Sequence, residues 1–189
     1  MESESVVTQQ LRRAFASTRT VLAEVRPSQL DAATPCVSWD VRALINHFVG
    51  SGRWGAAMVL GTESADKDYA AGDLLASYDD SRRVALAAFG SAGVLEKTIE
   101  LPFGRFSGTD LMNMVTRDQF THGWDLARAI GQPTDLDSDL ATELLAQAHL
   151  DILDTDRGPE GRAIFGPATK PSPPASPADQ LAAFLGRTC

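Results

Sequence analysis

The chain has 189 residues, of which 43% are hydrophobic and 22% charged, and its formal net charge is −8 at pH 7. This composition is typical of a globular domain and excludes a disordered chain and a membrane-spanning one. The acidic balance disfavours nucleic acid and anionic membranes as partners, because phosphate groups bind to basic surfaces. The start of the chain, MESESVVTQQ, is polar and has no apolar signal segment, so we expect a cytoplasmic protein.

Apolar residues recur at every third or fourth position along most of the chain, which is the period of helices that bury one face. The pattern predicts long helices over residues 5–25, 39–60, 73–89, 108–131 and 139–153, and a last short helix over 177–187. Ser38 is the expected N-cap of the second helix, and Gly131 marks the end of the fourth. In the second helix, Gly50, Gly52 and Gly55 permit either a bend or close packing.

Two segments do not follow the helical pattern. Residues 98–108, with Pro102 and Gly104 near their centre, predict a small hairpin or an irregular loop. The Pro- and Gly-rich residues 157–177 are expected to pack back across the helices before the final one. The predicted fold is therefore all-α: a single domain over residues 1–189, built as an up-down bundle of four main helices with extra short segments.

A candidate metal site follows from the spacing of three polar residues. Asp118 and His122 lie four residues apart in the fourth predicted helix, so they project from one face, one turn apart. His47 lies on the second helix, whose apolar residues, such as Leu44 and Phe48, would carry it towards the core. Two imidazoles and a carboxylate from two helices are typical of an open site with free positions for water or substrate.

Two long segments carry a resemblance to a known family. TPCVSWDVRALINHFVG contains His47, and THGWDLARAIGQ contains His122. They resemble the signature segments of the DinB and mycothiol-dependent maleylpyruvate isomerase N-terminal superfamily, and more narrowly its small actinobacterial metal-binding proteins. The resemblance spans nearly the whole chain and implies a DinB-like four-helix bundle that holds a divalent metal at its open end.

The resemblance assigns the metal ligands to His47, Asp118 and His122. The isomerase has glutamate at the position of Asp118, and many DinB-like proteins have histidine there. Aspartate keeps the charge but has a shorter reach, so either the helices approach more closely or a water fills the gap. The isomerase also has a C-terminal domain that contributes to its active site. A chain of 189 residues is too short to contain that domain, so maleylpyruvate isomerisation is not carried over.

Neighbouring charges offer both support and alternatives. Asp125, three residues after His122, is the candidate partner for the second ring nitrogen of that histidine, behind the metal. A salt bridge between Asp125 and Arg128 is the equal alternative. For Asp118, the alternative to metal binding is an ion pair with Arg117 or Arg128.

Zinc is the first expectation for the metal, since two imidazoles and one carboxylate suit it, and nickel, manganese and iron(II) are the alternatives. Trp54, Phe103 and Phe106 are candidates for lining a substrate pocket among the helix ends. Cys36 and Cys189 are predicted to be free thiols, because they match neither a disulfide framework nor a zinc clip. Nothing near Cys36 in the sequence forms a catalytic Cys/His pair.

Two classes of function fit this pattern. In the first, an enzyme uses its metal to activate water or a low-molecular-weight thiol such as mycothiol. The activated group attacks a small electrophilic substrate in a transfer, isomerisation or hydrolysis. No general base can be named from the sequence. The alternative is a non-catalytic metal-binding or stress-responsive module, which a fourth protein ligand would favour. A homodimer through an apolar helix face is expected from the family and the scaffold.

Overall fold

The computed structural model describes residues 5–65, 67–159 and 162–189. Within these ranges the protein is dominated by six α-helices, and its single small sheet has two strands. The helices are α1 (Val6–Leu22), α2 (Val41–Leu60), α3 (Leu74–Phe89), α4 (Gly108–Ile130), α5 (Ser138–Asp151) and α6 (Pro177–Phe184). The strands are β1 (Thr98–Leu101) and β2 (Gly104–Ser107), and two short 3-10 turns are η1 (Pro27–Gln29) and η2 (Asp154–Asp156). None of the described helices is both long and apolar enough to cross a membrane.

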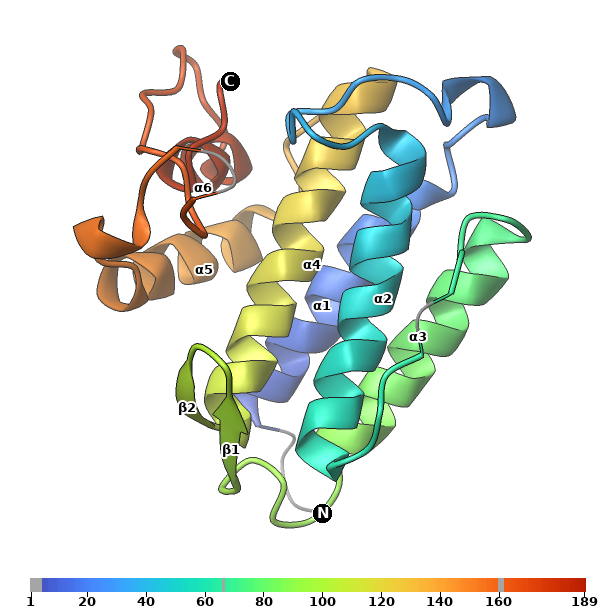
Figure 1. Ribbon diagram of the computed structural model, residues 1–189. Helices are drawn as coiled ribbons and strands as arrows, with labels where there is room; N and C mark the ends of the chain where they lie inside the picture. Colours follow the sequence, from blue (N-terminus) through green and yellow to red (C-terminus); the bar gives the residue numbers. More distant parts are fainter. Residues whose placement is uncertain (1–4, 66, 160–161) are drawn as a thin grey trace.

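Helices α1 to α4 lie side by side, and α5 and α6 pack together beside α4 (Figure 1). Both α1 and α2 contact α3 and α4, so the four long helices enclose a common interior. One apolar cluster fills this interior and includes Phe15, Phe48 and Phe89. A second cluster, around Phe120 and Trp124, joins α4 to α5 and α6. Helix α4 is therefore packed on two sides, which explains why nearly all of its second half is buried.

The direction of α3 corrects the up-down order that the sequence predicted. Near the middle of α2, Ser81 Oγ donates a hydrogen bond to the carbonyl oxygen of Val49 at 2.7 Å. Further along both helices, a Cβ atom added at Gly55 would lie 3.3 Å from the Phe89 ring. Residue numbers thus increase together along the contact, so α2 and α3 run parallel, as Figure 1 also shows.

The connection between α2 and α3 makes this parallel arrangement possible. It returns to the first half of α2, where the Asn46 side chain accepts hydrogen bonds from the backbone N–H groups of Tyr69 and Ala70, at 2.6 and 3.0 Å. Tyr69 and Ala70 are buried with exposed fractions of 5% and 4%. The connection is therefore a packed part of the fold that leads the chain back to the end of the molecule where α2 began.

The start of α2 also differs from the prediction. Asp40, not Ser38, is the N-cap, and its carboxylate accepts a hydrogen bond from the N–H of Ala43 at 2.8 Å. Because the helix begins at Val41, Trp39 remains in the connector in front of it. This connector also holds Cys36 and passes beside α4, where its side chains reach the candidate site.

The glycines of α2 serve close packing, one of the two roles that the sequence allowed. A Cβ atom at Gly52 would lie 2.7 Å from Ser81 Oγ, and one at Gly55 would lie 2.6 Å from a methyl group of Val115. The helix itself is continuous over its 20 residues. These glycines let α3 and α4 approach the α2 backbone.

The segment over residues 98–108 is a hairpin, which settles the alternative of an irregular loop. Strand β1 pairs antiparallel with β2, with Thr98 opposite Ser107, and Ser107 is also the N-cap of α4. Of residues 157–177, those described run back towards α6. Arg157 Nη1 donates to the carbonyl oxygens of Gly166 and Phe184, at 3.1 and 2.8 Å, and so ties this segment to the final helix.

Candidate metal centre

Helices α2 and α4 bring together the three residues that the sequence singled out. His47 lies two turns into α2, and Asp118 and His122 lie one turn apart on the face of α4 that packs against it. Each offers one ligand atom, and these atoms all lie within 4.8 Å of one another. The two imidazole rings meet edge to face, with their centroids 4.7 Å apart. Residues 71 positions apart in the chain thus form one cluster.

The Asp118 carboxylate is held at both oxygens. Its Oδ1 lies 3.0 Å from His47 Nε2 and 3.3 Å from His122 Nε2. Its Oδ2 accepts a 2.6 Å hydrogen bond from Ser51 Oγ, and Ser51 in turn accepts one from Gln119 Nε2 at 2.9 Å. One oxygen is therefore directed between the two imidazoles while the other is anchored to α2. Ser51 was not predicted, although it follows His47 by one helical turn on the same face.

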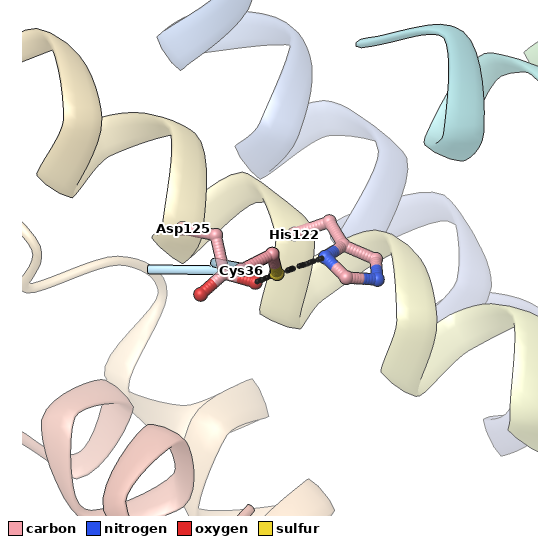
Figure 2. Close-up of side chains that lie close together, drawn as sticks. All are labelled: Cys36, His122 and Asp125. Carbon is pink, nitrogen blue, oxygen red and sulfur yellow. Dashed lines mark hydrogen bonds and ion pairs between the residues drawn. The ribbon is translucent and has the colours of Figure 1, made fainter. Parts of the chain in front are cut away.

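The second nitrogen of His122 faces a buried acid. His122 Nδ1 lies 2.9 Å from Asp125 Oδ2, and Asp125 is completely buried (Figure 2). The Cys36 thiol, from the connector before α2, donates to the same Oδ2 at 3.3 Å, and its sulfur lies 4.0 Å from His122 Nδ1. Since Nδ1 is held by Asp125, the Nε2 atom of His122 is the one presented to His47 and Asp118.

A cation from the far end of the chain completes this cluster. Arg187, which follows α6, donates from Nε to Asp125 Oδ1 at 3.2 Å and from Nη2 to Oδ2 at 2.9 Å. The partner of Asp125 among the described arginines is thus Arg187 and not the predicted alternative, Arg128. Arg117, offered as a partner for Asp118, instead pairs with Asp151 at 3.2 Å.

Trp39 forms an aromatic wall over both imidazoles. Its ring centroid lies 4.5 Å from that of His47 and 5.6 Å from that of His122. Its position just before the Asp40 N-cap is the one signal that could have placed it near the beginning of α2.

Charges around the site shift three pKa values. Burial alone would raise the pKa of Asp118, but the charge and hydrogen bond of His122, together with His47, hold it far below its usual range. Burial would lower the pKa of His122, but Asp118 and Asp125 outweigh it and raise that pKa well above its ordinary value. Burial likewise opposes ionisation of Asp125, yet His122 and Arg187 lower its pKa to about 2.

The three residues predicted to line a pocket belong to α2 and to the hairpin. Trp54 follows His47 by seven residues, which is roughly 10 Å along α2. Phe103 and Phe106 belong to the hairpin, with ring centroids 5.5 Å apart, and Phe103 is 58% exposed. The hairpin meets α4 at its beginning, about 15 Å along the helix from Asp118. A pocket lined by these residues stays a prediction.

The donor set of the cluster fits a divalent metal. Two imidazole nitrogens and one carboxylate oxygen converge. Asp118 and Asp125 favour the protonated form of His122, and a cation between the three ligand atoms would take the place of that proton. Cys36, His122 and Asp125 form a second group with metal-ligand chemistry, but there Arg187 Nη2 already lies 2.9 Å from the carboxylate. The first group is therefore the better candidate.

Zinc affinity is expected to rise with pH. Zinc needs the unprotonated Nε2 of His122, so binding must displace a proton below the raised pKa of that residue, by up to about tenfold in affinity per pH unit. The stability of the metal-free protein should instead fall as pH rises. The stability that His122 contributes is complete below its unfolded pKa of about 6.5 and is lost as pH rises through the higher folded value.

Chelator competition between pH 6 and pH 8 measures the first trend, and thermal melting with EDTA measures the second. His149→Ala is a matched control, because His149 is an exposed histidine on α5. It should leave both trends unchanged. A zinc affinity that does not vary over this pH range would contradict the assignment of His122 as a ligand.

Comparison with known proteins shows the family of the chain. The chain matches the family model for the mycothiol maleylpyruvate isomerase N-terminal domain over residues 11–127. Uncharacterized proteins from two strains of Mycobacterium tuberculosis are 40% identical to it over 185 residues, which cover 95% of this chain and 95% of each relative. No solved structure gives a significant match. The family match covers more than half of the chain and includes His47, Asp118 and His122, so the protein belongs to the mycothiol maleylpyruvate isomerase N-terminal domain family.

Proposed function

We propose that this protein is a DinB-like four-helix bundle that binds one divalent metal and uses it to activate a small thiol or water against an electrophilic substrate. The observation that carries the proposal is the convergence of His47, Asp118 and His122 from two packed helices. Membership of a family described by a mycothiol-dependent enzyme supports a low-molecular-weight thiol as the cosubstrate. Fold alone does not choose the reaction, so transfer, isomerisation and hydrolysis each need an assay.

Zinc is the proposed occupant. Two neutral imidazoles and a carboxylate match its preference for nitrogen and oxygen ligands, and three protein ligands leave a position for a thiol or water. Nickel, manganese and iron(II) accept the same donors, so the metal is to be identified by analysis of the purified protein. When bound, the metal would lower the pKa of a thiol or water, so that a nucleophile forms at neutral pH.

The residues of the chain prepare this site in three ways. Ser51 holds Oδ2 of Asp118 and leaves Oδ1 directed towards the ligand position. Asp125 holds Nδ1 of His122, which keeps Nε2 available as a ligand. Trp39 covers both imidazole rings on one side and limits their rotation. The negative charge of Asp118 also offsets part of the charge of a bound cation.

A set of three protein ligands would favour the catalytic function over the alternative, a non-catalytic metal-binding or stress-responsive module. Among the described residues, the group around His47 contains three potential ligands. The nearby Cys36 thiol lies on the Nδ1 side of His122 and so belongs to a different group. A site with three protein ligands is typical of catalytic zinc, whereas structural zinc has four.

The test is a conjugation assay on zinc-loaded protein with mycothiol or glutathione and the electrophile 1-chloro-2,4-dinitrobenzene. We expect zinc-dependent conjugation, reduced about a hundredfold or more in Asp118→Asn, which keeps the side-chain size but removes the ligand charge. Parallel assays with ester and maleylpyruvate substrates test hydrolysis and isomerisation. His149→Ala should retain the native rate. A native protein that binds zinc but accelerates none of these reactions would favour the non-catalytic module.

A further inference from the structure

We propose that Arg187 is a positioning residue of the metal centre. It fixes the Asp125 carboxylate, which in turn fixes His122 as a ligand. The inference rests on the proposed metal site, but it does not require the proposed thiol chemistry. It also extends the centre beyond residues 11–127, because the residue that supports it lies in the C-terminal segment.

The contact between Arg187 and Asp125 has the geometry of an oriented pair. Two parallel hydrogen bonds, from Nε to Oδ1 at 3.2 Å and from Nη2 to Oδ2 at 2.9 Å, engage both carboxylate oxygens. The Asp125 side chain is 0% exposed and that of Arg187 is 16% exposed, so water competes little with these bonds. A bidentate, buried contact restricts the rotation of the carboxylate, which a single exposed contact would not do.

The same carboxylate oxygen supports His122. Asp125 Oδ2 accepts from Arg187 Nη2 at 2.9 Å. The same oxygen lies 2.9 Å from His122 Nδ1, and Figure 2 shows the two side chains together. The Cys36 thiol also donates a hydrogen bond to this oxygen, at 3.3 Å. If the guanidinium were absent, Asp125 would keep its bond to His122 but lose the contact that sets the plane of the carboxylate. The imidazole would then be less well directed towards His47 and Asp118.

The backbone delivers Arg187 to this position through a turn after α6. Gly186 adopts a positive φ of 95°, and the N–H of Arg187 bonds to the carbonyl oxygen of Ala182 at 2.9 Å, which closes the helix and reverses the chain. Gly186 also lies against Gly166, whose Cα would be 2.7 Å from an added Cβ atom. The Thr169 hydroxyl donates to the carbonyl oxygen of Arg187. The arginine is thus held by a defined turn.

Helix α6 is also held in place by side-chain contacts that do not involve Arg187. Trp124 Nε1 and Thr134 Oγ1 both donate to Asp179 Oδ1, at 2.9 and 2.8 Å, and Leu181 packs in the second apolar cluster. Replacing Arg187 should therefore leave α6 in place. The buried pair with Asp125 is then an element that the packing of α6 does not itself require.

The experiment measures the zinc dissociation constant of native protein, Arg187→Gln and Arg187→Lys by chelator competition. Loss of a residue that orients a ligand typically weakens metal binding by 10- to 100-fold, and we expect about tenfold for Arg187→Gln. Arg187→Lys keeps the charge without the two parallel hydrogen bonds and should fall between this variant and the native protein. It also serves if Arg187→Gln does not fold.

Arg157→Gln is the matched control. Arg157 has a side chain 10% exposed and bonds to Gly166 and Phe184 of the same C-terminal region, but its hydrogen bonds go to backbone carbonyls away from Asp125. This variant should lower the melting temperature without changing zinc affinity. Asp125→Asn provides the second test, because in that background Arg187→Gln should have almost no further effect on affinity.

Each result shows whether Arg187 positions Asp125 for metal binding or only contributes to the packing of the C-terminal region. Equal zinc affinities in native protein and Arg187→Gln would overturn the inference and leave the metal site intact. So would an equal loss in Arg157→Gln, or a full loss from Arg187→Gln in the Asp125→Asn background. A native protein that binds no zinc would overturn the metal site itself. Zinc binding that depends on Arg187, without any thiol reaction, would support the inference and reject only the proposed chemistry.

Discussion

Replacing His122 with alanine is expected to reduce zinc affinity by more than about a hundredfold, because loss of a residue that merely supports a ligand already costs 10- to 100-fold. His122 is central to the site: its Nε2 lies 3.3 Å from Asp118 Oδ1 and its Nδ1 lies 2.9 Å from Asp125 Oδ2. Protein purified without an affinity tag should contain about one zinc or other divalent ion per chain. Elemental mass spectrometry should find almost none in His122→Ala.

Two further variants separate ligand loss from loss of the fold. His47→Ala removes a proposed ligand whose side chain is 34% exposed, so it should reproduce the metal loss with less effect on packing. His149→Ala removes an exposed histidine of α5 and should retain the metal. A native protein free of metal, or a His122→Ala variant with native metal content, would contradict the proposed metal site.

A methyl group at Gly123 is expected to destabilise the protein by about 2 kcal/mol. The Cβ atom would lie 2.3 Å from Thr18 Oγ1 and 3.2 Å from Thr18 Cα, so a change of the threonine rotamer alone cannot relieve the contact. Overpacking of this kind costs about 1–3 kcal/mol, and the hydrogen bond from Thr18 Oγ1 to the Gln119 carbonyl oxygen, now 2.7 Å, would be disturbed. The higher helix propensity of alanine offsets up to about 1 kcal/mol.

Urea unfolding of metal-free Gly123→Ala measures this effect on the contact between α1 and α4. Because Gly123 follows His122 directly, the displacement of α4 should also weaken zinc binding. Gly72→Ala is the control, since a Cβ atom there would meet no atom within 4 Å. If Gly123→Ala were as stable as the native protein or more so, helix propensity would outweigh packing and the close approach of α1 and α4 would be wrong.

The direction of α3 shows where local sequence signals end. The residues between α2 and α3, 61–73, form a polar stretch that reads equally well as a loop between antiparallel neighbours or as a long return. About 13 extended residues span up to roughly 40 Å, which exceeds the roughly 30 Å length of a 20-residue helix. The burial of Tyr69 and Ala70 favours the long connection that leads back along α2. This burial requires contacts with α2, such as the hydrogen bond from the Tyr69 N–H to Asn46.

The residues that support the site likewise could not be predicted from local sequence signals. Cys36 and Arg187 are 151 positions apart, yet their side chains meet around Asp125, with Arg187 Nη2 3.8 Å from the sulfur. No periodicity links a connector before α2 to a turn after α6. Likewise the Asp40 N-cap left Trp39 outside the helix, where its ring reaches both histidines.

The sequence by itself determined the helices and the placement of Asp118 and His122 on one helical face, because these follow from contacts between residues three or four positions apart. Only the tertiary structure decided that His47 faces this pair, that α2 and α3 run parallel, and that Arg187 supports Asp125. These depend on which buried surfaces pack together across the whole chain, and on the low exposure that makes a hydrogen-bonded carboxylate such as Asp125 require its partners.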